Sequence, residues 1–444
     1  MKKVIALMMV GLMFGTSCKQ PISSGKNPFD DAILFAKTVK ELNNVVLQNN
    51  FPPIIASRNY TYAAIAAYEV VALFDPRYTT LAGAITHLPA LPTLDTAKVN
   101  YQYAALLAFC KVGQAVTFPE GSMKEFVQSL DSLANVSELS DEVKKASRQL
   151  AQKVGDHILA WSKKDNYAQT RTAERYQIKL SDESRWVPTP PAYLQALEPH
   201  WNEIRPMVMD SASQFMPPRP PVYNMKDKNS LFYKEVLAVK NAGDSLTDEQ
   251  KHIAEFWDDL GNRTMVEGHV MFTAKKFTPT GHWMNIVGIA AKQAKSDFST
   301  TVYAYAKTAI AMFDAFIQCW DEKFRSNLVR PETVINKYMD PEWRPYLQTP
   351  PFPEYTCGHS TVSASAAEAL TSVFGDNFAY TDTSELEFGI KNRSFSSFRA
   401  AAIENNWARF YGGIHFHHSC IISTEHGKKV GELVVNKIKV KTQE

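Results

Sequence analysis

The sequence lacks the patterns that mark a β protein, a membrane-spanning protein or a disulfide-rich protein. No sustained alternation of apolar and polar residues and no convincing pair of hairpin strands occur, which excludes a predominantly β fold. Beyond the N-terminus there is no run of about eighteen uninterrupted apolar residues, so we expect no membrane-spanning helix. A net charge of +2 gives no overall electrostatic basis for a nucleic-acid partner.

Cysteine is scarce, with five residues in a chain of 444. Four of them lie far apart and lack the dense spacing of a disulfide scaffold, so we expect mostly buried free thiols at Cys110, Cys319, Cys357 and Cys420.

The fifth cysteine, Cys18, ends a targeting segment. Lys2 and Lys3 precede an apolar stretch over 4–14, and the small residues 15–17 then lead into Cys18, which resembles a relaxed bacterial lipobox. We therefore predict a lipoprotein signal peptide over 1–18, with Cys18 as the lipidated N-terminus and membrane anchor. The alternative is a plain secretory signal with an incidental cysteine. The expected location is a bacterial membrane lipoprotein facing the periplasm or the cell surface.

The remaining chain is predicted to be all-α. Residues 19–29 are polar and contain proline and glycine, as expected for a tether. Ser140 is a candidate helix cap, and Thr247 with Gln250 forms a capping-box pattern. Nine of the 24 prolines lie between Pro188 and Pro221, which predicts a long ordered loop or a connection between domains. We place a boundary near residue 225, between regions 30–225 and 226–444, although the two can share one helical core.

Three clusters in the last quarter of the chain carry the chemistry. The first is Lys323 with Arg330 and Pro331. Seven positions are about two helical turns, so both cations can lie on one helix face, and Pro331 then ends the helix or redirects the chain. Taken alone, the pair fits solvated surface cations better, because that is the usual environment of lysine and arginine.

The second cluster follows a proline-rich lead-in and reads Cys357, Gly358 and His359. Gly358 lets the backbone approach a ligand closely. An alanine-rich helix over 363–373 follows, so His359 is expected near a helix N-terminus, where free N–H groups favour an anion. An ordinary capping or surface histidine is the alternative.

The third cluster joins Arg409 to His415 across Gly412 and Gly413, which predict a break between two helices. A rival interpretation is a metal site, because histidines are dense here, at positions His415, His417, His418 and His426. However, His417 and His418 are adjacent and would diverge on a helix.

Together the clusters supply one lysine, two arginines and two histidines, which fit a tetrahedral oxyanion such as phosphate or vanadate. Fixed cations can neutralise equatorial oxygens, while two imidazoles can serve the axial positions. Their order and spacing make the combination far more specific than any single cluster.

This pattern resembles the superfamily that joins type 2 phosphatidic acid phosphatases and bacterial acid phosphatases with vanadium-dependent haloperoxidases. Lys323 and Arg330-Pro331 match its first motif, and residues 356–359 stand where it has Pro-Ser-Gly-His. Arg409 and His415 fit the third motif, but Ala408 and Ser419 replace its serine and aspartate. The fold implied is the helical bundle of this superfamily.

The resemblance also implies roles. Lys323, Arg330, Cys357, Gly358 and Arg409 would bind the oxyanion, His415 would coordinate vanadium or attack phosphorus, and His359 would be the general acid or base. Further matches at Trp320, Phe352 and Asp259 favour the haloperoxidase branch. The two aromatics would border the halide side, and the alternative for them is plain core packing. Asp259, matched loosely by one residue, would hold the arginines. The Ser419 departure calls for another acceptor to orient His415, such as a backbone carbonyl.

The implied activity is halide oxidation by hydrogen peroxide with a vanadate cofactor. The second hypothesis is a metal-free phosphatase that hydrolyses phosphate monoesters or lipid phosphates through a phosphohistidine. The third is a non-catalytic lipoprotein that retains the fold. Cys357 places an oxidisable thiol where peroxide would be activated, which argues mildly against efficient peroxidase turnover.

Overall fold

The computed structural model describes residues 27–261 and 263–440, so the predicted signal peptide, Cys18 and most of the tether lie outside the described residues. Helices dominate the described chain, as predicted. They are α1 (Ala32–Gln48), α2 (Pro53–Phe74), α3 (Tyr101–Val116), α4 (Lys124–Val136), α5 (Asp141–Ser162), α6 (Tyr167–Thr170), α7 (Leu231–Asp244), α8 (Asp248–Phe256), α9 (Pro279–Gln293), α10 (Phe298–Ser326), α11 (Pro331–Tyr338), α12 (Gly358–Phe374), α13 (Phe398–Tyr411) and α14 (His417–Lys437). Three short 3-10 helices are η1 (Pro28–Asp30), η2 (Trp201–Glu203) and η3 (Ser384–Phe388).

Local capping accounts for several helix boundaries. Ser140 caps α5 by accepting from the Val143 N–H, and Thr247 forms a capping box with Gln250 at the start of α8. Both predicted caps are therefore confirmed.

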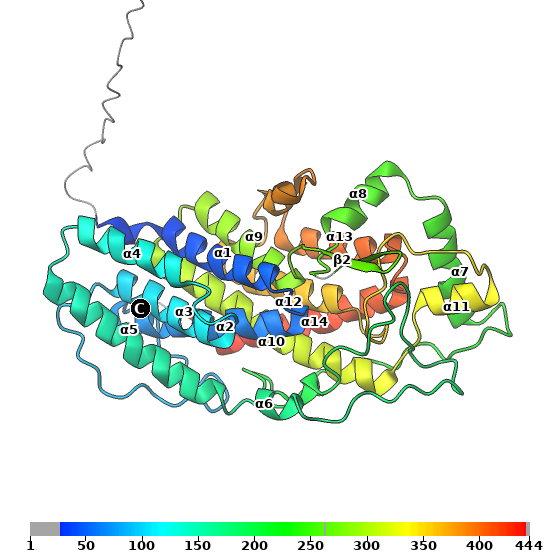
Figure 1. Cartoon of the computed structure of the whole chain (residues 1–444), viewed down its shortest axis with the longest axis horizontal. Coiled ribbons are helices and arrows are strands. Elements are labelled where there is room, and N and C mark those ends of the chain that lie inside the picture. The colour runs from blue at the N-terminus through cyan, green and yellow to red at the C-terminus, as the bar shows by residue number, and fades with distance from the viewer. Residues whose placement is uncertain (1–26, 262, 441–444) are drawn as a thin grey trace, which may run out of the picture.

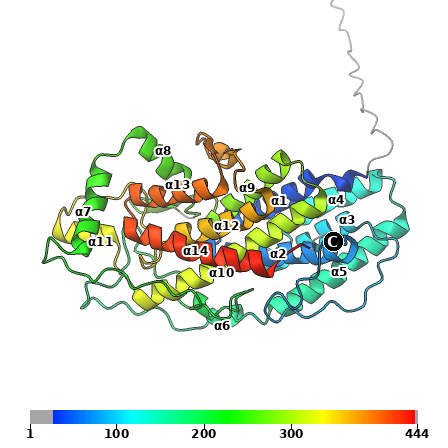
Figure 2. The ribbon, with the colours of Figure 1, turned by 180° about the vertical axis from the view of Figure 1, so that it is seen from behind.

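The long helix α10 organises the bundle. It packs against α2 and α9 on one side and against α12 and α14 on the other, and Figures 1 and 2 show it running through the middle of the molecule. Its residues are buried on nearly every face, as expected for a helix enclosed by others. The main hydrophobic core extends from Phe29 to Ile438, so residues on both sides of position 225 share it. No helix in the described residues is long and apolar enough to cross a membrane.

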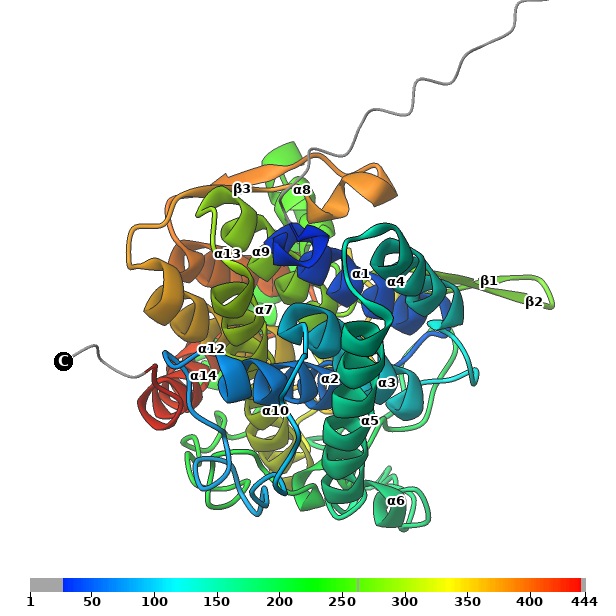
Figure 3. The same cartoon turned by 90° about the vertical axis from the view of Figure 1, so that its left-hand side faces the viewer.

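Two small antiparallel strand pairs correct the expectation that the chain has no hairpins. Strands β1 (Arg263–Glu267) and β2 (Val270–Ala274) project from the bundle (Figure 3), and β3 (Tyr380–Asp382) pairs with β4 (Arg393–Phe395). The first pair turns through Gly268 and His269, with Gly268 at φ +61°. A two-residue loop that starts with glycine favours a β-hairpin, so Gly268 and His269 were a sequence signal for this strand pair.

The proline-rich segment between 188 and 221 is an ordered loop that packs on α10. The backbone N–H groups of Met207, Val208 and Met209 donate to the buried carboxylate of Asp314 on α10. The loop also reaches Trp320, whose indole N–H donates to the Leu197 carbonyl at 3.1 Å. This segment therefore supports the helix that carries Lys323.

Candidate active site

The three clusters meet in one buried place. Lys323 lies near the end of α10, Arg330 just before α11, His359 in the first turn of α12, Arg409 near the end of α13, and His415 just before α14. All five side chains are 8% exposed or less. Long-range packing of five helices therefore gathers charges that the sequence keeps far apart.

Lys323 is held by the backbone of the proline-rich lead-in. Its Nζ donates to the carbonyls of Pro353 at 2.8 Å and Glu354 at 3.1 Å. Burial lowers the pKa of Lys323 to about 8, with Arg330 contributing in the same direction. Within residues 27–261 and 263–440, no carboxylate forms an ion pair with this ammonium, so it is well suited to receive an anion.

Arg330 does not share a helix face with Lys323, which corrects the sequence expectation. Helix α10 ends at Ser326, Asn327 adopts a left-handed conformation, and Arg330 is the extended N-cap residue of α11. Its Nε donates to the Phe352 carbonyl at 2.9 Å, and its Nη1 donates to the Ile414 carbonyl at 2.7 Å. The two cations still converge, because both lie about 5 Å from the Phe352 ring centroid, at 4.9 and 5.1 Å.

The second cluster forms the N-terminus of α12, as predicted, although the helix starts at Gly358, earlier than expected. A Cβ added to Gly358 would lie 3.5 Å from Trp320, an ordinary contact, so protein packing alone does not require glycine here. The imidazole of His359 is neutral, since burial together with Arg409 holds its pKa well below the ordinary value.

Arg409 is positioned by a carbonyl that the sequence analysis did not identify. Its Nη1 donates to the Trp257 carbonyl at 3.0 Å, 152 residues away in sequence. Gly412 and Gly413 separate α13 from α14, which confirms the predicted break between these helices. His415 therefore turns back toward the arginines.

His415 is oriented by the carboxylate of Glu354. The Glu354 Oε1 accepts from His415 Nδ1 at 2.8 Å and from the Phe416 N–H at 3.1 Å, and its Oε2 accepts from Ser419 Oγ at 2.9 Å. The orienting group is thus a carboxylate rather than the backbone carbonyl suggested above. Ser419 occupies the aspartate position of the family motif and binds this replacement carboxylate.

Hydrogen bonding also assigns the tautomer of His415. Arg330 Nη1 lies 3.1 Å from His415 Nε2, and a guanidinium can only donate. Nε2 therefore carries the lone pair, while Nδ1 carries the proton given to Glu354. An imidazole with a fixed Nε2 lone pair, backed by a carboxylate on its other nitrogen, is the arrangement that a metal-ligating histidine requires.

Several buried polar atoms around this point have no hydrogen-bond partner among the described residues. They are Arg330 Nη2, Arg409 Nε and His359 Nε2. Buried donors without partners are costly, so native proteins retain them where a ligand satisfies them. A tetrahedral oxyanion offers the acceptors that the two guanidinium groups need, and the residues present fit it.

The thiol of Cys357 is part of the same pocket. Burial alone would raise its pKa, but a hydrogen bond from Cys420, together with His415 and Arg409, holds the pKa of Cys357 well below its ordinary value. The pKa of Cys420 is correspondingly raised by burial and by the Cys357 thiolate. All four described cysteines are buried and free, as predicted.

Trp320 and Phe352 lie together at the edge of the cationic group. Their ring centroids are 5.0 Å apart, and both side chains are buried. Lys323 Nζ lies 5.6 Å from the Trp320 ring centroid. These two aromatics therefore lie against the buried cations.

Asp259 does not hold the arginines, contrary to expectation. Its Oδ1 lies 2.9 Å from His282 Nδ1, in a separate buried cluster. The neighbouring carboxylate, Asp258, is the one near enough to Arg409 for its pKa to be influenced, although burial is the dominant effect and raises that pKa. The ion pairs of Asp258 are with Arg263 and Lys276, at 3.9 and 3.8 Å.

The rival histidine metal site does not form in the described part of the chain. His415 binds Glu354, His417 stacks on Trp407 at 4.3 Å, and His426 Nδ1 lies 2.9 Å from the Phe215 carbonyl. The histidines of this segment thus have separate partners. The described residues that could jointly hold a metal lie elsewhere, at Asp259, His282 and Glu385.

Sequence reasoning missed the role of Glu354 and of the Trp257 carbonyl. An acidic residue inside the apolar, proline-rich stretch 350–357 was a usable signal, because an isolated carboxylate there must find a buried partner. No local signal pointed to Trp257, since a backbone carbonyl carries no sequence signature.

The fold and the site define an all-α protein that gathers buried cations and two histidines at one place. The family described as VCPO second helical-bundle domain matches residues 303–444. A bacterial vanadium-dependent iodoperoxidase of known structure is 41% identical, with a TM-score of 0.88, and the alignment covers 95% of this chain and 99% of that one. This chain belongs to the vanadium-dependent haloperoxidase family.

More distant structures share the fold. A holo-type bacterial vanadium-dependent chloroperoxidase is 17% identical, with a TM-score of 0.66 over 87% of this chain and 92% of that one. The apo-type structure is 18% identical, with a TM-score of 0.62 over 87% and 94%. No curated protein sequence matches this chain.

Proposed function

We propose that this protein is a vanadate-dependent haloperoxidase that uses hydrogen peroxide to oxidise halide, with iodide as the halide. The observation that carries the proposal is the set of unpartnered donors on Arg330 and Arg409 around the Nε2 lone pair of His415. The choice of iodide rests on the 41% identity to the bacterial iodoperoxidase.

The cations and the start of α12 bind the oxyanion in this proposal. Lys323, Arg330 and Arg409 would hold the oxyanion by neutralising its charge, and the Gly358 N–H would add the field of a helix N-terminus. Cys357 contributes its sulfur at the position where the family motif has serine. Bound vanadate supplies a Lewis-acidic centre that polarises hydrogen peroxide toward the halide.

The two histidines have different duties. His415 presents its Nε2 lone pair to vanadium, with Glu354 holding Nδ1–H and raising the basicity of the ring. His359, kept neutral by burial, accepts a proton from the entering peroxide and returns it to the departing hydroxide. In balance, halide, hydrogen peroxide and a proton give hypohalous acid and water, with the electrons passing from halide to the oxygen–oxygen bond. Trp320 and Phe352 border the side from which the halide approaches.

Reconstitution tests this function directly. Protein freed of metal should oxidise iodide in the presence of peroxide only after vanadate is added, and His415→Ala should abolish that gain. His157→Ala, on α5 and outside the site, is the matched control. Hydrolysis of a phosphate ester that vanadate inhibits, without iodide oxidation, would instead establish the phosphatase hypothesis. No vanadate binding at all would leave the non-catalytic lipoprotein.

We also propose that the protein is exported and anchored through a lipid on Cys18, facing the periplasm or the cell surface. The support is the order of charged, apolar and small residues over 1–18. Growth of an expressing bacterium with a labelled fatty acid should label the wild type and leave Cys18→Ser unlabelled. Equal labelling, or export without any label, would refute the anchor.

A further inference from the structure

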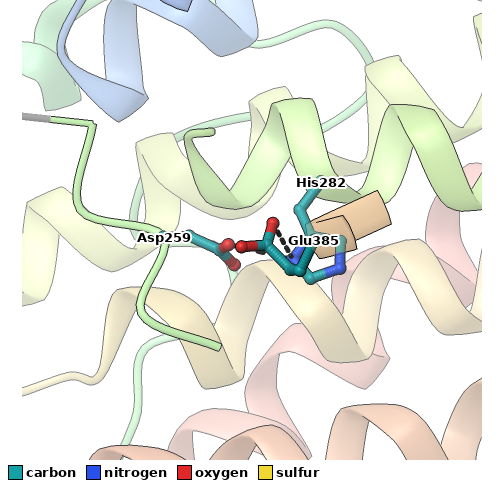
Figure 4. Close-up of side chains that lie close together, drawn as sticks. All are labelled: Asp259, His282 and Glu385. Carbon is teal, nitrogen blue, oxygen red and sulfur yellow. Dashed lines mark hydrogen bonds and ion pairs between the residues drawn. The ribbon is translucent and has the colours of Figure 1, made fainter. Parts of the chain in front are cut away.

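A second buried polar cluster lies outside the oxyanion pocket. Its centre is His282 on α9, with Asp259 from the segment after α8 and Glu385 from η3 beside it (Figure 4). Asp382 from β3 also contacts His282, at 2.9 Å. These four side chains are at most 1% exposed. Three carboxylates with one imidazole leave an excess of negative charge, which burial makes costly.

Hydrogen bonding satisfies only one side of this cluster. His282 Nε2 lies 2.9 Å from Asp382 Oδ2, and Asp382 Oδ1 accepts from the Ser384 N–H at 2.9 Å. On the other side, Asp259 Oδ2 and both Glu385 oxygens have no hydrogen-bond partner among the described residues. These unpartnered oxygens belong to the carboxylates that Figure 4 shows close to the imidazole.

The geometry of the unsatisfied side suits a small cation. His282 Nδ1 lies 2.9 Å from Asp259 Oδ1 and 3.8 Å from Glu385 Oε1, and one donor atom from each of the three residues falls within 4.8 Å of the others. Donors that bind zinc at about 2.0–2.2 Å lie roughly 3–3.5 Å from one another. Small side-chain movements would therefore bring the three donors around one ion.

We propose that Asp259, His282 Nδ1 and Glu385 bind a zinc ion. One imidazole with carboxylates suits zinc, whereas calcium and magnesium favour oxygen ligands alone. Asp382 then accepts Nε2–H from the opposite side of the ring, the outer carboxylate that zinc-bound histidines commonly have. The ion offsets the excess negative charge.

The location indicates a structural role. The three ligands come from separate segments, the loop after α8, α9 and η3, so the ion would join them. The His282 ring stacks on Trp257 with centroids 4.8 Å apart, and the Trp257 carbonyl holds Arg409. Zinc would therefore stabilise the region that supports one wall of the oxyanion pocket.

In the zinc-free cluster, the carboxylates and burial shift the pKa values of His282 and Glu385 upward. Asp259 and Asp382 overcome the effect of burial and hold the pKa of His282 well above its ordinary value, while burial raises the pKa of Glu385 to about 8.

Zinc titration of the chelator-treated, tag-free full chain tests the proposal. Calorimetry and elemental analysis should find one zinc per chain. Glu385→Gln removes a proposed direct ligand, so it should weaken zinc binding by at least the roughly 10–100-fold that loss of an outer-shell partner costs. Glu332→Gln is the matched control, because Glu332 is also buried but bonds Thr349 in another place. Equal zinc affinity in all three proteins would overturn the assignment.

A measurement on the wild type alone guards against a variant that fails to fold. Cobalt added in place of zinc should produce the visible absorption bands of a low-coordinate site with nitrogen and oxygen ligands, and zinc should remove them. A folded wild-type protein that binds neither ion would also overturn the site. Both outcomes are independent of haloperoxidase activity.

Discussion

Replacing Glu354 by glutamine should weaken vanadate binding while leaving the fold intact. Glu354 is fully buried and accepts from His415 Nδ1, Phe416 N–H and Ser419 Oγ. A glutamine can keep its amide oxygen on the first two donors and turn its N–H₂ toward the Ser419 oxygen, which can also accept. The shape and the His415 tautomer are then preserved, and only the negative charge is lost.

The magnitude follows from the change in hydrogen-bond type. A hydrogen bond to a charged group contributes about 1.5–3 kcal/mol, whereas a neutral one contributes about 0.5–1.5 kcal/mol. The expected loss is therefore about 1–2 kcal/mol, which raises the vanadate Kd roughly 5–30-fold. The loss appears in binding because His415 becomes a less basic ligand when the neighbouring carboxylate is neutralised.

The assay is a vanadate titration of the metal-free protein, with thermal unfolding as the check on folding. Glu69→Gln is a closely matched control. Glu69 is also buried and accepts from the Leu81 N–H and the Thr80 hydroxyl, and neither of these donors is a histidine. It should leave the vanadate Kd unchanged. A folded Glu354→Gln protein that binds vanadate as tightly as the wild type would refute the orienting role.

Three further predictions concern other groups. Cys357→Ser should raise the halide oxidation rate and prevent loss of activity during exposure to peroxide, because the pKa of the Cys357 thiol is low. Cys110→Ser is the control and should change neither property, because burial raises the pKa of that thiol. Equal inactivation of all three proteins would contradict this prediction. Burial lowers the pKa of Lys323 to about 8, so vanadate affinity should fall as the pH rises through about 8. The fall should reach up to roughly tenfold per pH unit relative to Lys323→Arg, whose guanidinium stays charged. A ratio of wild-type to Lys323→Arg vanadate Kd that does not vary with pH would be the contrary result. Asp314→Asn should lower the free energy of unfolding by about 1–3 kcal/mol in denaturant titrations. The N–H₂ group of the new asparagine must face at least one backbone N–H of residues 207–209, where the wild type has a carboxylate oxygen. Unchanged stability would show that the loop does not need this carboxylate.

Local sequence patterns were sufficient for most of the helices and for the types of residue in the site. Ser140 and the Thr247–Gln250 box set helix starts through contacts within three residues, and the glycine pair at 412–413 set a helix end. Such signals can be recognised in the sequence because both partners lie in one short stretch. The spacing of Lys323 and Arg330 also matched the family motif. The inference that both lie on one helix face was wrong, because α10 ends four residues before Arg330.

The sequence by itself determined the all-α class and the set of cations and imidazoles that an oxyanion needs, because periodicity and residue chemistry are properties of the chain. Only the tertiary structure decided which groups meet. Glu354 and His415 are 61 residues apart, and Arg409 and the Trp257 carbonyl 152 apart, so their contacts depend on how whole helices pack. The same packing places Asp259 on His282 rather than on the arginines, because a shift of one residue redirects a buried carboxylate to a different set of partners.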